Sequence, residues 1–287
     1  MHSEAKKRCC ALLFGAGDLR RSAYEKMGKR FIDDFDVILL DMGNTFMFEV
    51  DRFGASEDYH ATYRQLGGRR LSPGELRIHI DGVFDCMLAA SRDPTRYDDF
   101  GNVCRFLREM PGTRDLSGSE RELIAAVFAR HEVGTVPGTH ARVLQELHES
   151  HPLGIVSNVW SLSSVFEGEL EKAGIRRLFT VRVWSSDHVW IKPSAHLFQK
   201  ALAVFNVDTP RVLYVGDSPK RDVAGAKALG MGAVWIENKA RPLAPEDPQP
   251  DLIITDLTEL PGVTNKRRDA EQRAALDGDS TALHSRQ

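Results

Sequence analysis

Residues 37–45, V-I-L-L-D-M-G-N-T, decide the fold of this chain. Four apolar residues in a row, the first two β-branched, predict a strand that is buried on both faces and ends at Asp41. Gly43 and Asn44 then indicate a sharp turn. Open α/β sheets bind their ligands at the carboxyl ends of the strands, so Asp41 is a candidate for chemistry. It could equally end the strand or cap a helix.

Composition and charge bound the possible functions. The chain has 287 residues, enough for two domains or for one domain with a large insertion. Its 38 basic and 41 acidic residues give a net charge of −3, so we expect neither a nucleic-acid nor a membrane partner. No stretch approaches the roughly 18 consecutive apolar residues of a membrane span. Four cysteines without metal-binding or disulfide spacing predict a cytoplasmic protein. The oligomeric state is not indicated.

The pattern after the first strand changes to helices. Apolar residues recur at three- and four-residue spacing in four segments with no strand between them, 57–66, 73–90, 98–110 and 117–130. This spacing predicts a helical unit inserted directly after the first strand.

From Pro137 onward, short apolar runs alternate with amphipathic segments, which is typical of a parallel sheet covered on both faces. The predicted strands are 153–156, 179–184, 212–215, 233–236 and 252–254. The predicted helices are 139–150, 165–173, 195–205 and 222–229. We therefore expect an α/β core over 34–51 and 136–262 and a helical unit over 52–135. An N-terminal extension, 1–33, and a polar tail predicted to be disordered, 263–287, complete the chain.

Polar residues follow several of the predicted strands. Asp41 ends the first strand, Ser157 and Asn158 the second, and Asp217 a later one, while Lys192 precedes a helix that begins near Ser194. Carboxyl ends of parallel strands share one edge of a sheet, so two carboxylates, a lysine and a hydroxyl are expected to meet there. Such a set is suited to a divalent cation and a phosphate.

This ordered set resembles the haloacid dehalogenase superfamily, whose largest group is phosphatases. The resemblance covers about residues 34–262 and rests on D-M-G-N-T at 41–45, V-S-N at 156–158, I-K-P at 191–193 and G-D-S-P-K-R-D at 216–222. The place of the helical insertion is similar to the C1-class helical cap of that family. The resemblance implies a Rossmann-like parallel-sheet core with an α-helical cap. It also implies a metal-binding, Mg²⁺-dependent hydrolase acting on a small phosphorylated substrate.

Roles carried over from the family fall on eight positions of this chain. The nucleophile would be Asp41, with Lys192 neutralising charge and Ser157 holding the phosphoryl group. Asp222 would support the metal or orient Lys192. The implied substrate-binding residues are Asn158, Ser157, Gly43 and Asn44. The implied Mg²⁺ ligands are Asp41, the backbone carbonyl of Gly43, Asp217 and Asp222.

Gly43 is the one departure from the family pattern, because most phosphatases of the family carry an aspartate there as general acid and base. That assistance is worth about 10² to 10⁴ in rate. A phosphatase could work slowly or borrow a proton donor such as Glu49, Asp51 or His60. Alternatively, the protein could bind a phosphorylated ligand or a partner without turnover. A dehalogenase-like hydrolase is a third reading, but such relatives lack the aspartate found here at 217.

Overall fold

The computed structural model describes residues 29–265, which form two compact units. The smaller unit joins 29–34 to the segment that begins at Glu259. Within it, the amide of Phe31 donates to the carbonyl of Val263 at 2.8 Å, and Arg30 pairs antiparallel with Thr264. The predicted N-terminal extension and polar tail otherwise lie outside the described residues, 1–28 and 266–287 falling beyond them.

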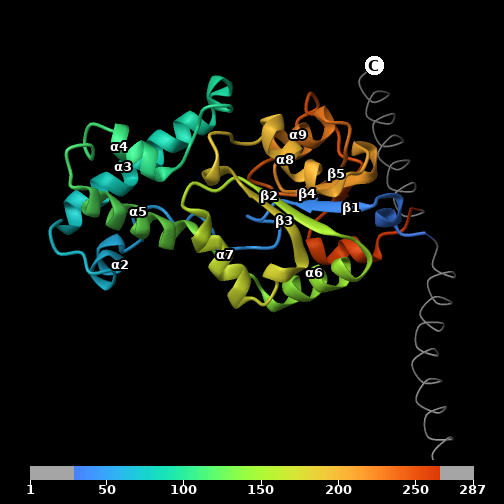
Figure 1. The fold of residues 1–287 in the computed structure, drawn as a ribbon, viewed down its shortest axis with the longest axis horizontal. Coiled ribbons are helices and arrows are strands. Elements are labelled where there is room, and N and C mark those ends of the chain that lie inside the picture. Colours follow the sequence, from blue (N-terminus) through green and yellow to red (C-terminus); the bar gives the residue numbers. More distant parts are fainter. Residues whose placement is uncertain (1–28, 266–287) are drawn as a thin grey trace, which may run out of the picture. The chain divides into compact units, whose positions relative to one another are not determined.

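The larger unit, residues 35–258, is built on a six-stranded, entirely parallel sheet (Figure 1). Its strands are β1 (Val37–Leu40), β2 (Leu153–Ser157), β3 (Phe179–Trp184), β4 (Val212–Gly216), β5 (Gly232–Ile236) and β6 (Leu252–Ile254). Their order is β3-β2-β1-β4-β5-β6, and all four residues of β1 are buried. The prediction of a parallel α/β sheet around a doubly covered first strand is therefore confirmed.

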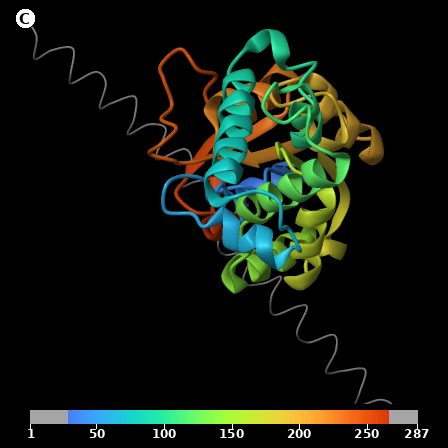
Figure 2. The same ribbon diagram turned by 90° about the vertical axis from the view of Figure 1, so that its left-hand side faces the viewer.

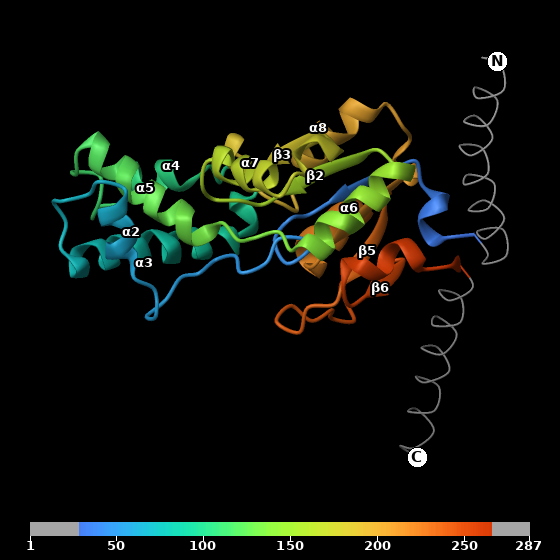
Figure 3. The same cartoon turned by 90° about the horizontal axis from the view of Figure 1, so that it is seen from below.

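Helices cover both faces of the sheet. Helices α6 (Gly138–Ser150) and α7 (Ser163–Lys172) lie on one face, and α8 (Ala195–Phe205) and α9 (Ala224–Ala228) lie on the other (Figures 1 and 3). Leu197 and Phe198 of α8 pack in one buried cluster with Val37 and Leu39 of β1, which shows why those strand residues are apolar. The helix predicted at 222–229 begins earlier, as a π-helical turn over Pro219–Val223.

Four of the helices between β1 and β2 precede α6 and form the inserted helical unit (Figures 1 and 2). They are α2 (Tyr59–Gln65), α3 (Pro73–Ser91), α4 (Val103–Glu109) and α5 (Gly118–Glu132). Each begins after a residue whose side chain accepts a hydrogen bond from the first turn, namely Asp58, Ser72, Asn102 and Ser117. Their apolar faces form one buried cluster that also includes Trp160 and Ile191, which come from the loops after β2 and β3. The inserted helices therefore pack against the loops that carry site residues.

Helix α4 starts at Val103, five residues later than predicted. The amides of Phe100 and Val103 donate to Val189 and Trp160 at 2.5 and 2.8 Å, so this segment bonds to neighbouring loops instead of continuing a helix. Gly101 also has a positive φ of 81°, a conformation that does not fit a helix. Within residues 29–265, no helix is long and apolar enough to cross a membrane.

Candidate active site

Asp41 lies at the carboxyl end of the central strand, as predicted. Its amide still donates to the carbonyl of Val215 at 2.8 Å, and the chain then leaves the sheet. Asn44 takes a left-handed conformation, with φ of 55°, and its amide donates to Met47 at 2.8 Å. Asparagine tolerates this conformation better than most side chains. The tight turn leaves the Asp41 carboxylate at the sheet edge, only 8% exposed.

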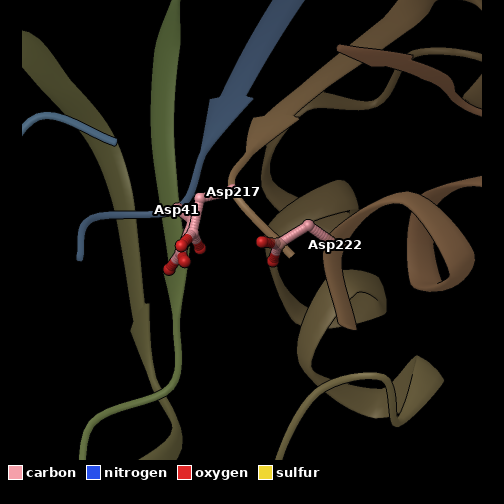
Figure 4. Close-up of side chains that lie close together, drawn as sticks. All are labelled: Asp41, Asp217 and Asp222. Carbon is pink, nitrogen blue, oxygen red and sulfur yellow. The ribbon is translucent and has the colours of Figure 1, made fainter. Parts of the chain in front are cut away.

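Three carboxylates meet at this edge (Figure 4). Asp41, Asp217 and Asp222 each offer an oxygen atom, and these atoms lie within 4.8 Å of one another. Burial raises the pKa of Asp217 and raises that of Asp222 to about 6, because the charged carboxylates lose hydration and repel one another. Clustered oxygen ligands of this kind fit a hard divalent cation such as Mg²⁺.

Lys192 joins two of the carboxylates. Its Nζ lies 2.9 Å from Asp41 Oδ1 and 2.6 Å from Asp222 Oδ1, and it donates to the hydroxyl of Tyr214 at 2.9 Å. An ammonium group has three N–H donors, so all three are used. Burial alone would lower the pKa of Lys192, but Asp222 and Asp41 raise it above its ordinary value. The buried side chain therefore stays positively charged beside Asp41.

Ser157, the last residue of β2, and Asn158, which follows it, hold this arrangement. The hydroxyl of Ser157 donates to Asp41 Oδ1 at 2.7 Å. Asn158 contacts the backbone of Lys192 twice, accepting from its amide at 2.7 Å and donating to its carbonyl at 3.3 Å. In this structure Asn158 thus anchors the loop that carries Lys192.

Gly216 explains how Asp222 comes so close to the sheet. A Cβ atom at Gly216 would lie 2.4 Å from Asp222 Oδ2. That oxygen accepts from the amide of Ser218 at 2.9 Å, while Oδ1 accepts from Lys192. Both carboxylate oxygens of Asp222 are therefore occupied by protein donors, which suits a residue that orients Lys192.

Six of the eight predicted positions line one pocket. They are Asp41, Gly43, Asn44, Asn158, Lys192 and Asp222. The other two, Ser157 and Asp217, are not among the lining residues. Ser157 donates to Asp41, and Asp217 belongs to the carboxylate cluster. The structure therefore brings all eight side chains or backbone positions to one edge of the sheet.

Sequence patterns did not single out the partners of Asp217. Arg241 Nη1 donates to both of its carboxylate oxygens at 2.8 and 2.9 Å, and Asn238 donates to Oδ2 at 2.7 Å. Both residues follow β5, the neighbour of β4, so the strand-end rule that found Asp41 could have found them.

Further charged groups line the same pocket, namely Asp51, Glu132, Arg221 and Arg241. Glu132 is buried and accepts from the amides of Trp160 and Ser161 at 2.6 and 2.7 Å. Burial, reinforced by the charge of Asp51, raises the pKa of Glu132 to about 7. Arg221 donates to Ser91 Oγ of α3 at 3.2 Å and so connects the pocket to the inserted helices.

Comparison with known proteins gives a family match and two named relatives. Residues 118–236 match the model for haloacid dehalogenase-like hydrolases. A phosphoserine phosphatase of Thermus thermophilus is 33% identical over 143 residues, 49% of this chain and 55% of the relative. A glyceraldehyde 3-phosphate phosphatase of Pyrococcus furiosus is 28% identical over 175 residues, 57% of this chain and 70% of the relative. The match therefore spans little more than half of the first relative's length.

A similar fold is found in a solved structure of 2-haloacid dehalogenase from Pseudomonas syringae pv. tomato. The TM-score is 0.57, with 23% sequence identity, and the match covers 79% of this chain and 96% of that chain. At this identity the likeness concerns the fold alone. The parallel sheet, the motif positions at its edge and the match over residues 118–236 together make the chain similar to haloacid dehalogenase-like hydrolases.

Proposed function

We propose that this protein is a Mg²⁺-dependent phosphatase that hydrolyses a small phosphate ester through an aspartyl phosphate on Asp41. The observation that carries the proposal is the position of Lys192, whose Nζ contacts Asp41 at 2.9 Å while Asp217 and Asp222 complete a carboxylate cluster. A carboxylate attacks a phosphate only if cations offset the repulsion between the two anions. The site supplies one such cation and the ligands for another.

The carboxylate cluster fits Mg²⁺ by its donor set, since the three oxygen atoms lie within 4.8 Å of one another. Asp41 and Asp217, with the backbone carbonyl of Gly43, would hold the ion. The contact of Arg241 with Asp217 does not exclude this, because a carboxylate has about four lone-pair positions. Bound there, Mg²⁺ would neutralise charge on the phosphoryl oxygens.

The chain's own residues would act in two stages. Asp41 attacks phosphorus and the ester oxygen departs; water then attacks the phosphorus of the aspartyl phosphate and frees Asp41. Lys192 stays charged beside Asp41 and offsets its charge while Asp222 and Tyr214 hold the ammonium group in place. Ser157, now donating to Asp41, and Asn44, which lines the pocket, would bind phosphoryl oxygens.

The two named relatives support a phosphatase of small metabolites, because both are named for phosphate esters of small molecules. The inserted helices would select the substrate, since they pack against the loops carrying Trp160 and Ile191 beside the pocket. We propose the class of phosphoric monoester hydrolases and a cytoplasmic location, in keeping with the free thiols of Cys86 and Cys104.

Phosphate release from a panel of phosphorylated metabolites, with Mg²⁺ and with chelator, tests the proposal. We expect release that requires Mg²⁺ and is abolished in Asp41→Asn, which keeps the size of the side chain. Release at the original rate by Asp41→Asn, or in excess chelator, would contradict the mechanism. Circular dichroism of the variant serves as the control for folding.

Gly43 favours a second candidate, a catalytically impaired protein that binds a phosphorylated ligand or a partner protein. Phosphate binding in equilibrium dialysis without turnover of any panel member would support it. The third candidate, a dehalogenase-like hydrolase, fits less well because Asp217 completes the carboxylate cluster. Halide release from 2-chloropropionate, assayed in parallel, separates that candidate from the other two.

A further inference from the structure

The space beside Gly43 is open. A Cβ atom built on Gly43 would meet only Val50 Cγ2, at 3.9 Å, which is an ordinary van der Waals contact. The next residue along the chain, Asp51, lines the same pocket as Asp41, Gly43 and Val50. Asp51 thus brings a carboxyl group to the pocket that Gly43 also lines.

We propose that Asp51 is the general acid and base of the reaction, in place of the side chain that Gly43 lacks. The inference rests on the proposed phosphatase function. Its basis is the position of Asp51 in the pocket of the Asp41 carboxylate and the way in which the backbone holds it there.

The backbone of Asp51 is fixed by the two segments that connect the inserted helices to the sheet. Its amide donates to the carbonyl of Glu132 at 3.0 Å, and its carbonyl accepts from Phe53 at 2.8 Å. Phe48 and Thr135 form an antiparallel bridge between the same segments. Asp51 itself has a φ of 55°, a left-handed conformation that Asp and Asn adopt more readily than other side chains. The backbone of Asp51 is therefore held beside the pocket by main-chain contacts.

Several charged groups of both signs interact with Asp51. Arg241 and Arg221 favour its ionised form, whereas Asp217 and Asp41 oppose it, and Glu132 interacts with it from α5. Asp51 is exposed to solvent where it lines the pocket, and the protein atoms around it remove part of its hydration. This loss of hydration is the main cause that raises the pKa of Asp51 to about 6. A group of this kind can both give and take a proton near neutral pH.

The proton movements balance over the two stages. While Asp41 attacks phosphorus and the P–O bond to the ester oxygen breaks, Asp51 gives its proton to that oxygen, and the alcohol leaves. Asp51, now a carboxylate, takes a proton from water as the water oxygen attacks phosphorus and the bond to Asp41 breaks. Inorganic phosphate leaves, and Asp51 is again protonated.

Other acids near this position are less suited. Glu132 also lines the pocket, but both of its oxygens accept from the amides of Trp160 and Ser161. Glu49 and His60 are not among the pocket-lining residues. Glu49 nevertheless shares the left-handed conformation of Asp51, with φ of 57°, and lies in the same segment, which makes it a matched control.

The decisive variants are Asp51→Asn and Glu49→Gln, assayed with Mg²⁺ and 4-nitrophenyl phosphate. Asparagine keeps the size and the left-handed preference, so the fold is expected to survive. We expect Asp51→Asn to lower steady turnover by about 10² to 10⁴ while rapid mixing shows a burst of nitrophenolate, because a good leaving group needs no acid but dephosphorylation needs the base. Glu49→Gln should behave as the wild type does.

Rescue provides the readout that a structural role would not give. Because the space at Gly43 is open, Gly43→Asp in the Asp51→Asn background should remove the burst and restore turnover. Unchanged turnover in Asp51→Asn, or lost turnover without a burst and without rescue, would overturn the assignment. These outcomes leave the Asp41 mechanism intact, whereas wild-type activity that survives Asp41→Asn would defeat the proposed function itself.

Discussion

Replacing Lys192 by methionine tests the charge arrangement of the site. The side chain of Lys192 is 1% exposed, and its Nζ pairs with Asp41 and Asp222. The side chain of Asp222 is equally buried. Lys192→Met keeps the aliphatic volume but leaves two carboxylates beside each other without their cation. Breaking a buried pair from one side costs about 3 to 5 kcal/mol. We expect a loss of this size in the free energy of unfolding at pH 8.

Urea unfolding in chelator measures the effect without any contribution from a divalent cation. Lys227→Met is the matched control, because Lys227 pairs with Asp251 while both side chains keep contact with solvent, 27% and 37% exposed. Such a pair is worth about 0 to 1 kcal/mol. At pH 5 the loss in Lys192→Met should shrink, because Asp222, whose pKa is already raised to about 6, then becomes neutral. Equal losses for the two variants at pH 8 would refute the reasoning.

Two further perturbations follow from close contacts and from burial. Gly216→Ala places a Cβ atom 2.4 Å from Asp222 Oδ2, so the carboxylate must move and release Lys192. The rate of phosphate release should therefore fall sharply. An unchanged rate would show that Asp222 does not position the lysine. Burial raises the pKa of Glu132 from 4.5 to about 7, so its protonated form stabilises the fold fully below pH 4.5, and this contribution is lost as the pH rises to about 7. Between these pH values the wild type should therefore lose about 3 kcal/mol of unfolding free energy relative to Glu132→Gln. A difference between the two proteins that does not change with pH would contradict the raised pKa.

Local patterns were sufficient for the sheet and for the residues at its edge. Strand β1 could be predicted because four buried apolar residues end abruptly at Asp41, and the alternation of strands and helices after Pro137 required a parallel arrangement. Since strand ends in a parallel sheet converge, the sequence alone could assign Ser157 and Asp217 to the same edge.

Contacts between distant segments could not be predicted in the same way. The start of α4 depends on backbone bonds from Phe100 and Val103 to loops 57 or more residues away, which periodicity does not encode. Arg241 reaches Asp217 from a loop whose sequence indicates only a turn. For Asp51, the sequence could suggest a nearby acid, but only the bonds between the two connecting segments place it in the pocket.

Transfer of the phosphoryl group to Asp41 is tested most directly by acid quenching a single turnover and locating phosphate by peptide mass spectrometry. We predict a phosphorylated aspartate in the peptide that contains residues 37–45, formed faster than phosphate is released and absent in Asp41→Asn. The acyl phosphate should survive the acid quench and disappear on treatment with hydroxylamine. Release of phosphate by the wild type with no phosphate found on Asp41 at any quench time would contradict a covalent mechanism at this site.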